Sequence, residues 1–298
     1  MIAFESSDNA SGHTAIPERT PTSANRLLRS LGISPKKALG QTFLVSEGVV
    51  AKIISAAEIK NGDLVLEVGP GLGVLTDALV NLQAKVIALE IDPRLTRLLC
   101  DNYSSVPNVT ILNEDARKID LTKLVPSNKP YIMVSNLPYY SGTNILRTFL
   151  ESDNKPQRVV VMVQREVASR MLATPGRLGL LGIGVQIFGK PKIIDHVPPG
   201  AFYPRPKVTS TIVRIDMLEN PLVPKENQAG FFTLVKAGFS APRKQLGGVF
   251  RHTMSVPKDN LASCLAKASV DPKRRAESLS IKEWIALYRS FKESHWIH

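Results

Sequence analysis

The sequence has little of what several protein classes require. It contains only two cysteines, Cys100 and Cys264, which are far apart and match no metal-binding or redox spacing, so reduced thiols in a cytoplasmic protein are expected. The five histidines are scattered and suggest no metal site. No apolar run is long enough to cross a bilayer, and the N-terminus carries acid rather than base, unlike a secretion signal. We therefore expect a cytoplasmic protein that binds neither metal nor membrane.

Acidic residues are also too few to balance the charge. There are 26 of them against 38 lysines and arginines, which leaves a net charge of +12 at pH 7. The length of 298 residues and the apolar fraction of 43% suit one large globular domain or two ordinary ones. A surface this basic favours a polyanionic partner, and nucleic acid before membrane.

The turn after the first predicted buried strand is rich in glycine. Leu64–Val68 is an apolar run typical of a strand buried on both faces, and Val74–Val80 follows with helical periodicity. Between them lie three glycines in five positions, G-P-G-L-G. Glycines at such a turn let the backbone approach a ligand closely. Because the spacing differs from the dinucleotide G-x-G-x-x-G, the loop predicts a nucleotide-type cofactor without identifying it.

Acidic residues follow two further predicted strands. Glu90 stands at the tip of the strand Lys85–Glu90, where a carboxylate accepts hydrogen bonds from both hydroxyls of a cofactor ribose. Asp115 follows the strand Val109–Leu112, where an acid can accept the amino group of a cofactor adenine. Both positions agree with a ligand crevice at the carboxyl ends of parallel strands.

The predicted strand Tyr131–Ser135 ends in the string NLPYY, residues 136–140. The Asn136 amide and nearby backbone carbonyls can accept hydrogen bonds from a planar amine. Pro138 fixes the backbone, and Tyr139 offers a ring for stacking. At the tip of a strand in an open parallel sheet, this combination predicts a site for an amine-bearing aromatic ring.

The remaining pattern divides the chain into three parts. We expect a disordered or adhering tail over residues 1–24, an α/β domain over 25–218 and a helical domain over 219–298. Within the α/β domain the pattern further predicts helices at Asn25–Leu31, Glu47–Ala57, Arg94–Asn102 and Gln164–Leu172, strands at Val159–Val163, Ile183–Phe188 and Thr209–Ile215, and a proline-stiffened loop over 197–208 near the crevice.

The last hundred residues are helical in pattern and strongly basic. Helices are predicted at Phe231–Phe239, Leu261–Ala268 and Ile281–Phe291, and residues 200–298 carry a net charge of +8. The clusters Arg243-Lys244 and Lys273-Arg274-Arg275 are expected to bind phosphates.

Together the motifs resemble those of the rRNA adenine dimethyltransferase family. The matching strings, in the family's order, are LGQTFL (39–44), EVGPGLGVLT (67–76), ALEID (88–92), NED (113–115), NLPYY (136–140), AFYPRPKVTSTIVR (201–214) and RRAESLS (274–280). The sequence departs from the usual pattern at Thr42 and Tyr140, where asparagine is common. The last string resembles the housekeeping small-subunit branch more than the sister branch that methylates large-subunit rRNA and confers macrolide resistance.

The resemblance implies a Rossmann-like class I S-adenosylmethionine methyltransferase sheet with a smaller C-terminal all-helical domain. It implies dimethylation of the exocyclic amine of two adjacent adenosines near the 3′ end of 16S rRNA, within the small ribosomal subunit, and a role in subunit maturation. S-adenosyl-L-methionine is the implied cofactor. We expect a monomer that needs no metal.

The resemblance also assigns residues to roles. Those implied to bind the cofactor are Gln41, Thr42, Leu44, Glu67, Gly69, Gly71, Glu90, Ile91, Asp115, Ala116 and Asn136. Those expected to receive the target adenine are Asn136, Leu137, Pro138 and Tyr139, with Phe202 on the other face of the base. Those expected to contact RNA are Lys36, Lys37, Arg243, Lys244, Lys273, Arg274 and Arg275.

Three other functions remain open at this stage. A nicotinamide dehydrogenase would require the G-x-G-x-x-G spacing and a catalytic histidine or a tyrosine–lysine pair, and neither is evident in the sequence. A non-catalytic rRNA-binding assembly factor would keep the basic C-terminal part but would not need an intact cofactor loop. A large-subunit (23S) rRNA methyltransferase would share the N-terminal motifs but not the last string.

Overall fold

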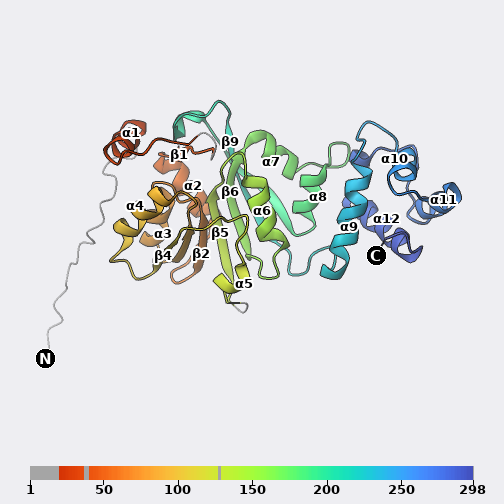
Figure 1. The fold of residues 1–298 in the computed structure, drawn as a ribbon, viewed down its shortest axis with the longest axis horizontal. Coiled ribbons are helices and arrows are strands. Elements are labelled where there is room, and N and C mark those ends of the chain that lie inside the picture. Colours follow the sequence, from red (N-terminus) through yellow and green to blue (C-terminus); the bar gives the residue numbers. More distant parts are fainter. Residues whose placement is uncertain (1–19, 37–39, 127–128, 298) are drawn as a thin grey trace.

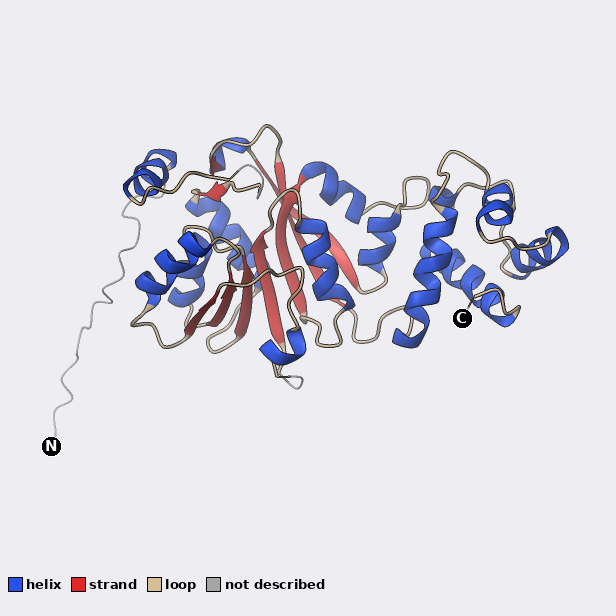
Figure 2. Ribbon diagram, in the orientation of Figure 1, coloured by secondary structure: helices blue, strands red, loops and turns tan. Residues whose placement is uncertain are grey.

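The computed structural model describes residues 20–36, 40–126 and 129–297. Its centre is a seven-stranded sheet with helices on both sides (Figure 2). The strands are β2 (Leu64–Val68), β3 (Lys85–Leu89), β4 (Val109–Leu112), β5 (Tyr131–Asn136), β6 (Arg158–Gln164), β7 (Gly189–Val197) and β9 (Ser210–Met217). Their spatial order is β4-β3-β2-β5-β6-β9-β7.

The first five of these strands in the spatial order are parallel, and β9 is antiparallel to both β6 and β7. The carboxyl ends of β2, β3, β4 and β5 therefore share one edge of the sheet. The predicted α/β class with a Rossmann-like parallel sheet is confirmed, and so is the prediction that the glycine loop, Glu90 and Asn136 follow neighbouring strands.

Helices bury both faces of the sheet. On one face α2 (Glu47–Ala57) and α3 (Val74–Asn81) place Ile53 and Leu79 against Val65 and Val134. The other face is covered by α6 (Gly142–Glu151), α7 (Arg165–Met171) and α8 (Leu180–Gln186). Strands covered on both sides are apolar at successive positions, which explains the continuous run of β2. Two further helices, α4 (Pro93–Tyr103) and the single-turn α5 (Leu121–Leu124), follow β3 and β4.

The C-terminal helices gather at one end of the molecule, opposite the end that carries α1 (Pro21–Ser30) (Figure 1). They are α9 (Lys225–Gly238), α10 (Leu246–Thr253), α11 (Lys258–Lys267) and α12 (Ile281–Glu293). Trp284 of α12 is fully buried and stacks on Phe239 with ring centroids 5.6 Å apart. The boundary predicted at residues 218/219 falls in the connection between β9 and α9.

The N-terminal helix begins earlier than the sequence pattern predicts. The helix α1 (Pro21–Ser30) starts four residues before the expected start at Asn25, so residues 21–24 do not belong to a tail. Thr20 caps it, with its side chain accepting from the Ser23 backbone, and proline at the first helical position suits a helix start. Ala24 is 1% exposed. Residues 1–19 of the predicted tail lie outside the described residues.

The strand predicted at Ile183–Phe188 is wrong, because this segment lies mostly in α8. Short apolar runs do not distinguish a buried strand from a buried helix turn. The actual strand is the following segment, β7, an edge strand that is largely polar and contains Pro191. Proline is tolerated there because an edge strand leaves backbone positions unpaired.

The helix α10 was not predicted, since Gly247 and Gly248 in its first turn weaken the helical signal.

A two-stranded antiparallel ribbon lies beside the main sheet. It joins β1 (Phe43–Leu44) to β8 (Phe202–Tyr203), with Leu44 opposite Phe202. The Val45 backbone N–H extends the contact by donating to the Ala201 carbonyl at 2.9 Å. The ribbon thus joins the LGQTFL segment to the proline-rich loop, since Leu44 pairs with a residue 158 positions later in the chain.

Candidate functional site

A cavity of about 230 Å³ lies at the carboxyl ends of β2, β3, β4 and β5. Its walls come from residues 40–44, from the glycine loop, and from the segments that follow β3, β4 and β5. All eleven residues expected to contact the cofactor line it: Gln41, Thr42, Leu44, Glu67, Gly69, Gly71, Glu90, Ile91, Asp115, Ala116 and Asn136. Leu137 and Pro138 line it as well.

The glycines of the loop have two different functions in the fold. Gly71 has φ +61°, and a Cβ there would lie 3.0 Å from the Phe43 ring, so glycine lets the loop pass under β1. Gly73 does not line the cavity. A Cβ at Gly73 would lie 2.7 Å from the Tyr103 hydroxyl, so this glycine serves the packing of α3 against α4. Only the first two glycines of G-P-G-L-G therefore face a ligand.

Glu90 presents a buried carboxylate to the cavity. It is 4% exposed, and its two oxygens accept the backbone N–H groups of Gly71 at 3.3 Å and Asp92 at 2.9 Å. Burial raises the pKa of Glu90, while the bonds from Asp92 and Gly71 act in the opposite direction. Each oxygen has a second lone pair, so the carboxylate can also accept a pair of ligand hydroxyls.

Glu67, at the base of the cavity, is the most strongly perturbed acid there. Its Oε2 accepts the Thr76 hydroxyl at 2.7 Å, whereas its Oε1 is buried without a hydrogen-bond partner. Burial raises the pKa of Glu67 to about 8. A buried acceptor with no partner costs stability, so Oε1 marks a place where a ligand donor would be favourable.

Asn136, at the end of β5, carries a second buried acceptor without a partner. Its Nδ2 donates to the Thr42 carbonyl at 3.0 Å, which fixes the orientation of the amide. Its Oδ1 has no partner. Among the described residues, four buried side-chain atoms lack a partner, and the only two acceptors, Glu67 Oε1 and Asn136 Oδ1, belong to residues of this cavity. The site therefore suits a ligand that brings N–H or O–H donors.

Asp115 faces the cavity as an ionised group. Arg117 binds it through several hydrogen bonds, including Nη2 to Oδ2 at 2.6 Å, and this guanidinium is the main cause of the lowered pKa of Asp115. An ionised carboxylate only accepts hydrogen bonds, so it can accept an amino group but cannot donate to a carbonyl. Arg117 also lines the cavity and was not predicted.

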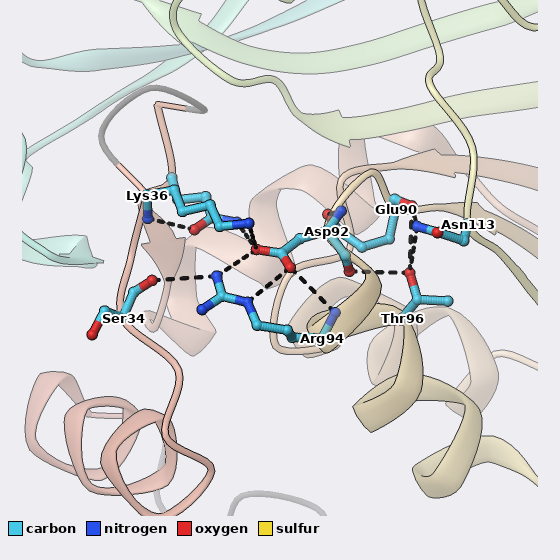
Figure 3. A network of polar contacts seen from close by, with 8 residues as sticks. Ser34, Lys36, Glu90, Asp92, Arg94, Thr96 and Asn113 are labelled. Atoms are coloured by element: carbon cyan, nitrogen blue, oxygen red, sulfur yellow. Dashed lines mark hydrogen bonds and ion pairs between the residues drawn. The ribbon is translucent and has the colours of Figure 1, made fainter.

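Asp92, which the sequence analysis did not single out, connects two walls of the cavity (Figure 3). Its side chain is fully buried and pairs with Arg94 at 2.7 Å and Lys36 at 3.6 Å. Gln41 donates to it from Nε2 at 3.1 Å. Lys36, expected to contact RNA, is therefore already paired within the protein, and Lys37 lies outside the described residues.

The aromatic residues near the cavity differ in their exposure and contacts. Tyr139 and Phe202 are not among the residues that line the cavity, whereas Tyr140 lines it and is 79% exposed. The Tyr139 hydroxyl lies 2.8 Å from Ser210 Oγ, and burial is the main cause of its raised pKa.

Phe202 was expected to cover the second face of a base, and this geometry contradicts that expectation. The pairing of β8 with β1 places its ring in the core beside Leu44 and Ile212, with 1% exposure. No face of the ring is available to a ligand in this arrangement.

The basic clusters of the C-terminal part meet in space. The Leu246 backbone donates to the Arg274 carbonyl at 2.8 Å, and Arg275 Nε donates to the Arg243 carbonyl at 3.1 Å. Arg243, Lys244, Lys273 and Arg275 are exposed. Arg274 is different, because its guanidinium pairs with Glu283 and bonds to Ser278. Arg274 therefore helps to stabilise the start of α12, and its predicted contact with RNA stays a prediction.

The described residues contain no candidate metal cluster and no candidate membrane span. Within residues 20–36, 40–126 and 129–297, no three histidine, cysteine or acidic side chains are grouped so as to hold a metal ion. In the same ranges no helix combines the length and apolar character needed to span a bilayer.

Comparisons with known proteins agree with this geometry. The family model described as "Ribosomal RNA adenine dimethylase" matches residues 33–293. A "Ribosomal RNA small subunit methyltransferase A" from Dehalococcoides mccartyi is 41% identical over 91% of this chain and 93% of its own length. One of the same name from Bacillus pumilus is 38% identical over 90% and 95%.

Solved structures are similar over most of the chain as well. A dimethyladenosine transferase from Plasmodium falciparum is 27% identical, covers 86% of this chain and 99% of its own, and has a TM-score of 0.69. The 23S rRNA methyltransferase ErmE is 25% identical, covers 84% and 99%, and has a TM-score of 0.66.

Proposed function

The chain belongs to the ribosomal RNA adenine dimethylase family, and we propose that it dimethylates two adjacent adenosines near the 3′ end of 16S rRNA in the small ribosomal subunit. It is an rRNA adenine methyltransferase with S-adenosylmethionine as its cofactor, as the sequence motifs implied. The single observation that carries the site assignment is the unpartnered Asn136 Oδ1 in the cavity beside the glycine loop.

The small subunit is favoured over the large one by degree of similarity. The relatives named for the small subunit reach 41% identity over 91% of the chain, whereas the 23S enzyme ErmE is 25% identical. A purely non-catalytic assembly factor would have no need for two buried acceptor atoms without partners, Glu67 Oε1 and Asn136 Oδ1, in an intact cofactor cavity. Dimethylation during subunit maturation is therefore the function that these observations support best.

The cavity suits each part of the cofactor. Glu67 Oε1, which has no partner, would accept the ammonium group, and the Glu90 carboxylate would accept the ribose hydroxyls. Asp115, kept ionised by Arg117, would accept the adenine amino group. Ile91 and Ala116 line the same end of the cavity and would flank the adenine ring. When bound, the cofactor supplies an electrophilic methyl group on a sulfonium sulfur.

The target amine is a poor nucleophile, because its lone pair is delocalised into the adenine ring. An N–H of that amine donating to Asn136 Oδ1, and another to the backbone near Leu137, would pull the nitrogen towards tetrahedral geometry. The lone pair then points at the methyl group. By holding the amine in this orientation, Asn136 and the backbone near Leu137 would supply much of the rate through positioning, without a strong base.

Two tyrosines follow Asn136, and they suit different tasks. The Tyr139 hydroxyl is fixed by Ser210, so its half-buried ring is held in one orientation next to the strand end. Tyr140 is 79% exposed at the cavity wall and would stack on a base extruded from the RNA. Stacking on an aromatic ring contributes about 1–3 kcal/mol per base, which is comparable to the cost of unstacking it.

The affinity for RNA would come from the exposed basic patch of Arg243, Lys244, Lys273 and Arg275. The direct test is incubation with methyl-labelled S-adenosylmethionine and undermethylated small or large subunits, followed by mapping of the labelled base. We expect label on two adjacent adenosines near the 3′ end of 16S rRNA. Label on 23S rRNA alone, or none on either subunit, would refute the proposal.

A further inference from the structure

Asp92 takes no part in the proposed transfer, yet its contacts link the two sides of the cofactor cavity. Its backbone N–H donates to Glu90 Oε1 at 2.9 Å, and its side chain accepts from Gln41 Nε2 at 3.1 Å. Glu90 and Gln41 both line the cavity, but Asp92 does not. The two partners come from β3 and from the segment before β1, which are about fifty residues apart in the chain.

The same carboxylate gathers further contacts from the N-terminal segment (Figure 3). Lys36 Nζ lies 3.6 Å from Asp92 Oδ2, and the Lys36 backbone N–H donates to Gln41 Oε1 at 2.7 Å. Arg94 pairs with Asp92 at 2.7 Å and reaches the Ser34 carbonyl at 3.4 Å. Ser34, Lys36 and Gln41 are therefore all fixed relative to the start of α4.

This attachment continues to the reacting end of the cavity. Gln41 is followed by Thr42, whose carbonyl accepts Asn136 Nδ2 at 3.0 Å. We propose that Asp92 is a positioning residue, which closes the segment around residues 40–44 over the cofactor cavity and so raises affinity for the cofactor without touching it. The proposal rests on the proposed use of S-adenosylmethionine by this cavity.

The charge of Asp92 strengthens its hydrogen bond to Gln41, which connects residues 40–44 to the start of α4. Its side chain has no exposed area, and hydrogen bonds from Arg94 are the main cause of its strongly lowered pKa. Hydrogen bonds to an ionised acceptor are roughly twice as strong as neutral ones. The attachment therefore persists at any pH at which the enzyme works.

Asp92 also caps α4, since its Oδ1 accepts the Arg94 backbone N–H at 3.2 Å, and this role must be separated from positioning. Asp120 provides the matched control. It caps α5 in the same way, accepting the Thr122 backbone N–H at 3.1 Å, and pairs with Lys123 three residues further on. Neither Asp120 nor these two partners line the cavity.

The experiment measures cofactor binding to the purified full chain by calorimetry. Asp92→Asn should raise the Kd for S-adenosylmethionine by about tenfold or more, while Asp120→Asn leaves it unchanged. The rate of methyl transfer at saturating cofactor should stay within about twofold of wild type for Asp92→Asn. Gln41→Ala should also raise the Kd for S-adenosylmethionine. The Kd of the double variant should be no higher than that of whichever single variant binds the cofactor less tightly.

A Kd for Asp92→Asn within about twofold of wild type, or additive effects of the Gln41 and Asp92 substitutions, would refute the positioning role. If Asp92→Asn does not fold, Gln41→Ala decides, because it removes the hydrogen bond from Gln41 to Asp92 but keeps the Asp92 cap of α4, and an unchanged Kd overturns the proposal. Failure of the wild-type chain to bind S-adenosylmethionine would instead overturn the proposed cofactor.

Discussion

Replacing Glu67 by glutamine should stabilise the cofactor-free protein, and more so as the pH rises. Burial raises the pKa of Glu67 from 4.5 to about 8 in the folded state. Between these values the folded protein keeps a proton that the unfolded chain has released, so stability falls as pH rises through this window. At 1.36 kcal/mol per pKa unit, the loss between pH 4.5 and pH 7 is roughly 3 kcal/mol. Glutamine cannot ionise, so the variant avoids this loss.

Glutamine also keeps an acceptor for the Thr76 hydroxyl, so the local packing should survive. The assay is denaturant unfolding of wild type and Glu67→Gln, without cofactor, at pH 5 and pH 8. The two proteins should be similar at the lower pH, and the variant should be more stable by a few kcal/mol at the higher one, on the order of the loss worked out above. Glu114→Gln, at an exposed position of the same cavity, is the control.

An equal difference at both pH values would refute the reasoning, because it would show that Glu67 is not protonated in the folded state. The proposed role in binding makes an opposite prediction for function. The variant lacks the carboxylate that would receive the cofactor ammonium, so its affinity for S-adenosylmethionine should fall although its stability rises. Strain of this kind is commonly found at functional sites.

Other substitutions test the remaining parts of the site. Glu90→Gln should weaken S-adenosylmethionine binding by on the order of tenfold in calorimetry, since a charged acceptor of two hydroxyls is lost; unchanged affinity would contradict the ribose assignment. Joint replacement of Lys273 and Arg275 by glutamine should weaken subunit binding and flatten its salt dependence, with an unchanged salt slope arguing against the basic patch. Arg274→Gln should instead lower the melting temperature, because its partner is internal. Tyr140→Ala should slow methyl transfer on subunits more than Tyr140→Phe does; equal rates would exclude a stacking role.

The cavity walls at the strand ends could be predicted from the sequence, because they follow from topology. In a parallel sheet the carboxyl ends of neighbouring strands lie along one edge, so Glu90, Asp115 and Asn136 had to come close once their strands were recognised. The glycine loop follows β2, which lies between β3 and β5 in the sheet. Each of these residues indeed lines one cavity.

Contacts between distant segments could not be predicted in this way. Nothing in the pattern around Lys36 or Arg274 indicates that a buried aspartate or a helix-capping glutamate pairs with them. Both were expected to contact RNA. The burial of Phe202 depends on the pairing of two-residue strands, which leave too short a pattern to detect. The predicted RNA contacts, monomeric state and cytoplasmic location stay predictions.

The account depends most directly on Asn136 as the acceptor of the target amine. The decisive measurement is single-turnover methyl transfer to undermethylated small subunits by wild type and Asn136→Ala, with filter binding on the same subunits. The acceptor acts most strongly as the amine acquires charge in the transition state, so the rate should fall by on the order of a hundredfold while RNA affinity stays within about twofold. Transfer by Asn136→Ala at the wild-type rate would contradict the proposed mechanism.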